Sequence, residues 1–168
     1  QLSHAIETQS QVDDIEQNII QSFNDERLLS IVDFWMKNPL FKEHEFIIRH
    51  GVKMFIEGND ICAIHILYPR IEGLLRYLYA KKHKNSPYSS DLRSLLIIET
   101  ENKNKITNLF LPLDFDEYLR DFYFKHFNVS INDVEVGRHS VSHGVAQDFS
   151  RKSAFQAILI LDQLNYYI

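Results

Sequence analysis

The sequence has 168 residues, of which 45% are hydrophobic, and its formal net charge is −5 with histidine neutral. This size and apolar content suit one domain, or one compact domain with a helical extension. The acidic balance excludes the basic stripe of a protein that coats long nucleic acid. Glycine (5) and proline (4) are sparse, so few turns join long elements, which favours an all-α fold.

A single cysteine, Cys62, stands in an apolar run. One cysteine excludes an internal disulfide and a zinc site built from several cysteines, and we expect Cys62 to be a buried small hydrophobic residue. No apolar run approaches the ~20 residues of a membrane span, and we expect no signal peptide. The composition fits a reducing cytoplasm. Because the chain begins at Gln1, we expect a fragment of a longer protein with an additional domain.

The first third of the chain has the apolar spacing of helices. Residues 1–11 are polar and aperiodic, which predicts a tail or the frayed start of a helix, whereas the apolar residues of 12–23 recur at helical spacing. Asn24 restarts a helix, since its side chain can accept backbone N–H groups and two acidic residues follow in the first turn. Pro39 is placed to open the next helix, which we expect to end at Gly58 in a left-handed conformation.

The segment from Asp60 to His83 is the longest and most apolar of the chain, and it predicts the central helix. We expect Asp60 to cap it and Pro69 to remove one backbone hydrogen bond and bend it modestly. Residues 81–87, at the C-terminal end of this segment, are basic and polar. They indicate positive charges at the C-terminus of the helix followed by a loop, and the alternative is a patch that contacts RNA. The apolar residues on one line of this helix are Ile61, Ile64, Tyr68, Ile71, Leu75 and Leu78.

The last third predicts three further helices. Residues 91–98 form a short helix, and a second helix begins at Asp114, where Glu117 three residues later completes a capping box. Residues 128–136 are mixed and β-branched, typical of a connector, and Ser150 caps the final helix. We expect these residues to face the core: Tyr118, Leu119, Phe122, Tyr123 and Phe127 in the earlier helix, and Ala154, Ala157, Ile158, Leu161 and Leu164 in the final one, with Phe155 and Leu159 beside them.

Most of the potential chemistry lies in residues 136–144, Val-Gly-Arg-His-Ser-Val-Ser-His-Gly. Arg138 has a permanent charge and a planar fork that suits phosphate oxygens, and His143 can transfer a proton near neutral pH. Together they suit attack of a ribose 2′-hydroxyl on the adjacent phosphodiester, which requires no metal in principle. In a helical run the arginine, His139, Ser142 and the second histidine would share one side. Alternatively, Arg138 pairs with an acid and His143 is a half-buried residue near a helix end.

This segment resembles the motif of the HEPN superfamily, whose ribonuclease members carry an arginine, a polar residue, three further residues and a histidine. Residues 138–143, Arg-His-Ser-Val-Ser-His, follow that pattern. The final helix carries a Leu161-Asp162 pair similar to that of such domains, and residues 69–76 look like their central-helix motif. The resemblance spans residues 60–168 and leaves the N-terminal third uncovered.

The resemblance implies a helical bundle with extra N-terminal helices, in which residues 1–58 pack on a HEPN-like domain of residues 59–168. It also implies a homodimer whose two motifs meet in a shared cleft and cut RNA without a metal or other cofactor, leaving a 2′,3′-cyclic phosphate and a 5′-hydroxyl. By position, Arg138 would stabilise the phosphate and His143 would be the general acid or base. His139 would orient either His143 or the phosphate. An antitoxin as a partner, and a role in phage defence or a toxin–antitoxin pair, are further implications.

Supporting residues come from the central helix and the motif. Glu72 and Arg76 share a helical face with His65. An unpaired acid is costly to bury in an apolar helix. Glu72 is therefore either exposed or in a salt bridge, for which Arg76 four residues on is a candidate, or it holds Arg138 or His143 in position. Ser142 is a further supporting residue, and His65 is more simply a packed or surface histidine.

Two other functions stay open. His139 and His143 are four positions apart, which suits two zinc ligands on a helix, although Ser140 stands where metalloproteases carry glutamate and no third ligand is evident. The other alternative is a non-catalytic helical interaction or dimerisation domain of a larger protein, which the acidic charge favours. We predict a metal-independent endoribonuclease-like domain that acts on RNA, with these two functions as alternatives.

Overall fold

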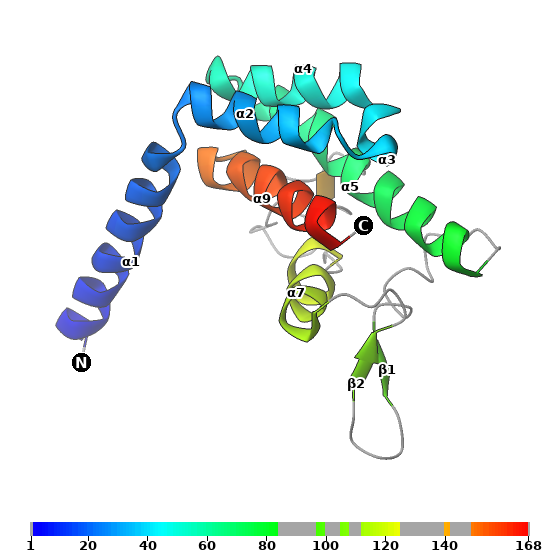
Figure 1. The fold of residues 1–168 in the computed structure, drawn as a ribbon. Coiled ribbons are helices and arrows are strands. Elements are labelled where there is room, and N and C mark those ends of the chain that lie inside the picture. Colours follow the sequence, from blue (N-terminus) through cyan, green and yellow to red (C-terminus); the bar gives the residue numbers. More distant parts are fainter. Residues whose placement is uncertain are drawn as a thin grey trace.

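The computed structural model describes residues 2–83, 97–99, 105–107, 112–124, 140–141 and 149–167, and Figure 1 shows their arrangement. Helices dominate, which confirms the predicted all-α fold class apart from one short hairpin. None of the described helices combines the length and apolar content that a bilayer span requires. The elements are α1 Leu2–Ser22, α2 Asp25–Trp35, α3 Pro39–Lys42, α4 Glu45–Ile56, α5 Asp60–His83, β1 Ile97–Glu99, β2 Lys105–Thr107, α7 Leu113–Tyr118, the π-helix η1 Leu119–Tyr123 and α9 Arg151–Tyr167.

The hairpin corrects one predicted helix. β1 and β2 pair antiparallel, with Ile97 opposite Thr107, so the helix predicted over residues 91–98 is wrong at its end. β-Branched side chains lose rotamer freedom in a helix and suit an extended strand, which is the local reason for the hairpin. The rest of that predicted helix, Phe127 and the predicted connector over 128–136 lie outside the described residues.

The N-terminal helix α1 stands away from the other helices and meets them near its end (Figure 1). Its backbone is helical from the second residue, so of the two alternatives predicted for residues 1–11 the structure shows the start of a helix and not a tail; no glycine or proline interrupts the helix there. Glu16 of α1 forms an ion pair with Lys152 of α9 at 2.6 Å. Beyond α1, the Phe23 ring meets the Phe155 ring edge-on, with 4.9 Å between the ring centroids.

The predicted starts of α2 and α3 are confirmed. The Asn24 side chain accepts from the backbone N–H of Arg27 at 2.8 Å and starts α2, and Pro39 is the first residue of α3. Gly58 has a φ of 78°, the predicted left-handed stop after α4. The single helix predicted between that proline and that glycine is nevertheless two helices. A turn at residues 43–44 separates α3 from α4, and no glycine or proline marks it in the sequence.

The central helix is confirmed, because α5 packs against both α4 and α9. Cys62 is exposed, so its predicted burial is wrong. It lies two positions before the buried Ile64, and at about 100° per residue this puts it on the opposite side of the helix. Ile61, in the first turn, is 56% exposed and also departs from the prediction. The buried residues of the predicted line are Ile64, Tyr68, Ile71 and Leu75.

One hydrophobic core contains residues from both predicted segments of the chain, 1–58 and 59–168. Trp35 of α2 is fully buried, and its indole N–H donates to Asp162 Oδ1 of α9 at 2.8 Å. The Phe41 ring lies 5.9 Å from the Trp35 ring, centroid to centroid. Residues on both sides of the predicted boundary at 58/59 therefore share one core, and the division into two domains stays a prediction.

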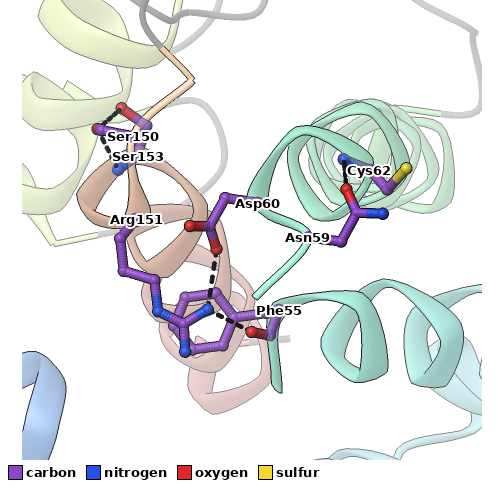
Figure 2. A network of polar contacts seen from close by, with 7 residues as sticks. All are labelled: Phe55, Asn59, Asp60, Cys62, Ser150, Arg151 and Ser153. Carbon is purple, nitrogen blue, oxygen red and sulfur yellow. Dashed lines mark hydrogen bonds and ion pairs between the residues drawn. The ribbon is translucent and has the colours of Figure 1, made fainter. Parts of the chain in front are cut away.

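A polar network joins α9 to the turn between α4 and α5 (Figure 2). Arg151 Nη1 donates to Asp60 Oδ1 at 2.8 Å and also to the carbonyl of Phe55, and its guanidinium carbon lies 3.4 Å from the centroid of the Phe55 ring. The predicted cap by Asp60 is wrong. Asn59 Oδ1 instead accepts from the backbone N–H of Cys62 at 3.2 Å, which leaves the aspartate to bind the arginine.

The capping box predicted at Asp114 does not form in α7. The helix begins one residue earlier with Pro112 at its N-cap position, and no described side chain caps it. Ser150 does cap α9 as predicted, since its Oγ accepts from the backbone N–H of Ser153 at 3.2 Å (Figure 2). The predicted inward face of α9 is buried, whereas Leu159 beside it is 37% exposed.

Gly51 marks a close approach of α4 to α5. A Cβ at this position would lie 2.5 Å from Leu67 Cδ2 and 2.9 Å from Ile66 Cγ2. We therefore expect Gly51→Ala to lower the free energy of unfolding by about 1–3 kcal/mol, although alanine favours a helix. Gly73→Ala in α5 is the matched control. No described atom lies within 4 Å of its Cβ position, so the free energy of unfolding should rise by up to about 1 kcal/mol. Urea denaturation followed by circular dichroism measures both changes, and equal effects would contradict the close packing.

Candidate functional site

Of the predicted motif, the structure describes only the middle. Ser140 and Val141 are helical and buried, with 2% and 6% of their surface exposed. Val141 belongs to the same apolar core as α5 and α9, so the middle of the motif is packed into the protein. The four predicted site residues of the motif lie outside the described residues, and their roles stay predictions: Arg138, His139, Ser142 and His143.

Glu72 and Arg76 form an ion pair on α5, which is one of the two predicted alternatives. Glu72 Oε1 accepts from Arg76 Nε at 2.8 Å and from Arg76 Nη2 at 2.7 Å. The glutamate side chain is 14% exposed and the arginine side chain 27% exposed, so water screens this pair less than a surface pair. The pair therefore holds a carboxylate and a guanidinium in fixed positions on one face of α5. A contact of Glu72 with the motif falls outside the part of the chain that is described.

The π-helix η1 lies against α5 close to this pair. Tyr123 Oη donates to the carbonyl of Tyr68, one helical turn before Glu72, at 2.5 Å. The backbone N–H of Phe124 bonds to the carbonyl of Leu119 at 2.8 Å, with the five-residue spacing of a π-helix. Burial raises the pKa of Tyr68, so its phenol keeps its proton at neutral pH. π-Helical turns are rare and frequently lie at functional sites, which singles out this side of α5.

Asp116 of α7 is a buried acid that the sequence reading missed. Its side chain is fully enclosed, and neither carboxyl oxygen has a hydrogen-bond partner among the described residues. Burial raises its pKa to about 7, while Arg120 lowers it and Glu117 raises it further. The available signal was spacing: Asp116 lies three and seven positions before the buried Leu119 and Tyr123, on the same helical stripe. A carboxyl group with this pKa can exchange a proton near neutral pH, which is a property of many functional acids.

His65 makes structural contacts on the exposed side of α5, in line with the predicted packed or surface histidine. Its Nδ1–H donates to the carbonyl of Ile61 at 3.0 Å. Its ring stacks on the ring of Phe149, with 5.1 Å between the centroids. Because Phe149 comes two residues before α9, this contact places the start of α9 beside the first half of α5.

No group of three or more histidine, cysteine, aspartate or glutamate side chains is placed to bind a metal within the described ranges. The alternative zinc ligands His139 and His143 fall outside those ranges, so the zinc alternative stays untested. Comparison of the chain with protein-family models, with curated proteins and with solved structures found no match. The HEPN resemblance therefore rests on the quoted residues and enters only as a proposal.

Proposed function

We propose that this protein is a metal-independent endoribonuclease of HEPN type, which cleaves RNA by attack of the ribose 2′-hydroxyl and acts as a homodimer with a composite site. The proposal rests on the residue types and spacing of 138–143. One structural observation carries it: the middle of this motif is helical and buried.

The burial of Ser140 and Val141 supports a surface site made by their neighbours. Successive residues of an α-helix are separated by about 100° around its axis. If helical geometry continues on both sides of the buried pair, the arginine and both histidines of the motif fall on the far side of the helix. The reactive side chains would then lie together at the surface, where a phosphodiester can reach them.

In the proposed reaction, each part of the site has one task. His143 accepts the proton of the 2′-hydroxyl as the 2′-oxygen bonds to phosphorus, and the partner subunit's His143 gives a proton to the 5′-oxygen as its bond to phosphorus breaks. Arg138 stabilises the negative charge that develops on the non-bridging phosphate oxygens. His139 and Ser142 orient these groups, and the Glu72–Arg76 pair provides fixed charges beside the site. The products are a 2′,3′-cyclic phosphate and a 5′-hydroxyl.

End-group analysis of cleaved RNA tests this function. Purified protein is incubated with total RNA in the presence of EDTA, and the new ends are identified by their reactions with phosphatase and kinase. We expect 2′,3′-cyclic phosphate and 5′-hydroxyl ends from the natural sequence, and no cleavage by the double variant Arg138→Ala/His143→Ala. Cleavage that persists in the double variant, or that requires a metal, would overturn the proposal.

A non-catalytic interaction domain is the second candidate, because several large apolar side chains are exposed. Phe46 on α4 is 86% exposed, and Ile15 on α1 is 58% exposed. Apolar groups at a surface can mark a site for a protein partner, including an antitoxin or a further domain of a longer chain. If expression of the protein inhibits growth equally with and without the Arg138→Ala/His143→Ala change, this candidate replaces the nuclease.

A further inference from the structure

A surface pocket of about 440 Å³ lies where the ends of several helices meet. It is formed by the end of α2 and the turn that follows it, by α3, by the C-terminal half of α5 and by the end of α9. Its volume falls within the range of ligand-binding pockets. The pocket is therefore large enough to take a side chain of a partner, and its lining indicates which one.

Two exposed aromatic rings line the pocket. Phe34 of α2 is 56% exposed and Tyr77 of α5 is 45% exposed. The Phe34 ring already has a cation over it, since the ammonium group of Lys37 lies 5.5 Å from the ring centroid. The face of an aromatic ring attracts cations because its π electrons carry partial negative charge. This part of the pocket thus favours a flat, positively charged group.

The pocket also holds two oxygen acceptors for which the described part of the chain supplies no partner. The Glu43 carboxylate forms no ion pair or hydrogen bond with any described side chain, whereas the nearby Glu45 binds both Lys42 and Arg49. Asn165 Oδ1 is enclosed at the pocket wall and accepts no hydrogen bond from any described residue. The terminal torsion of an amide is soft, so this group can turn toward a donor that enters the pocket.

We propose that this pocket receives an arginine side chain of a partner polypeptide. A guanidinium is planar and carries five N–H donors, so it can lie on an aromatic ring, pair with Glu43 and donate to Asn165 at the same time. An ammonium group lacks the flat face. An anion could pair with Lys37, but it would be repelled by Glu43 and would leave the faces of the two aromatic rings without a cation. The net charge of −5 attracts a basic partner. Arginine and tyrosine are also enriched among the interface residues that contribute most to binding between proteins.

Titration of the full chain with a capped tripeptide, acetyl-Gly-Arg-Gly-amide, tests this inference by calorimetry or amide NMR shifts. We expect this peptide to bind about tenfold more tightly than the matched lysine peptide and the neutral citrulline peptide. Glu43→Gln should weaken binding about tenfold. Lys37→Met should strengthen it about threefold, because it removes the cation that competes for the Phe34 ring. Glu26→Gln on α2 is an exposed control with the same change of net charge, and it should leave the affinity unchanged.

Three results would overturn the inference. The first is equal binding of the arginine and citrulline peptides, or an affinity that Glu43→Gln does not change. The second is the reverse pattern, in which Glu43→Gln strengthens binding and Lys37→Met weakens it, since this would identify an anionic ligand. The third is tighter binding of free L-arginine than of the capped peptide together with its loss in Lys37→Met, which would identify a free amino acid as the occupant.

Discussion

Replacement of His143 or Arg138 by alanine is expected to lower the rate of RNA cleavage by about 10²–10⁴-fold. The histidine variant loses a proton-transfer group, so one limb of the pH–rate profile should disappear with it. The arginine variant loses charge stabilisation in the transition state, so kcat should fall more than the affinity for RNA. Cleavage of a fluorescent oligoribonucleotide under single-turnover conditions measures both effects.

The control for this prediction is His50→Ala. His50 is exposed on α4 and stacks on the Phe46 ring, with 6.5 Å between the ring centroids. Its removal should leave the cleavage rate unchanged. A comparable loss of activity in His50→Ala, or full activity in either motif variant, would contradict the assigned roles.

The composite site has its own expected result. The natural chain and the double variant Arg138→Ala/His143→Ala are mixed in equal amounts under conditions of subunit exchange. If two copies complete one site, mixed dimers are inactive, so the mixture should have about a quarter of the activity of the same total amount of natural chain. If each subunit had an independent site, the mixture would have about half of that activity. The fraction of activity that remains therefore distinguishes a shared cleft from two separate sites.

Asp116→Asn is expected to raise the free energy of unfolding at pH 8 by about 2–4 kcal/mol and to change it little at pH 4. Burial raises the pKa of the Asp116 carboxyl from 3.8 to about 7 in the folded protein. Between these two values the unfolded chain releases the proton and the folded chain keeps it, so ionisation favours unfolding as the pH rises. Above pH 7 the folded protein holds a buried carboxylate to which no described group donates a hydrogen bond. Asparagine has nearly the same shape and no charge, so the variant avoids this cost.

Urea unfolding at both pH values measures the effect of Asp116→Asn. Asp114→Asn is the matched control, because Asp114 lies on the same helix with its side chain exposed. That control should change the free energy of unfolding by less than about 0.5 kcal/mol at either pH. An equal gain at pH 4 and pH 8, or no gain at pH 8, would mean that ionisation of Asp116 does not limit stability.

Helix ends were predictable where the determining residue acts on its own neighbours. Asn24 and Ser150 each accept a backbone N–H three residues ahead, and Pro39 and Gly58 impose backbone angles on themselves. The competition between Asn59 and Asp60 was not predictable, since both can cap a helix. Arg151, which lies 91 positions away in the sequence, binds Asp60 and leaves the cap to Asn59. A contact over that distance exists only after α9 has packed on the turn between α4 and α5.

Whether a residue is buried was also predictable only in part from the sequence. The amphipathic spacing of α5 and α9 by itself determined most of their inward residues, because helical periodicity is a local property. The close approach of α4 to α5 at Gly51 depends on how these two helices pack, so no local pattern predicted it.

For the proposed function, the sequence by itself determined the residue types and spacing of 138–143, which are the chemistry that an RNA-cleaving site needs. Only the tertiary structure showed that Ser140 and Val141 in its middle are buried, and that Glu72 pairs with Arg76. The physical reason is that residue type sets which reactions are accessible, whereas burial and pairing depend on segments that are distant in sequence and meet only in the folded protein.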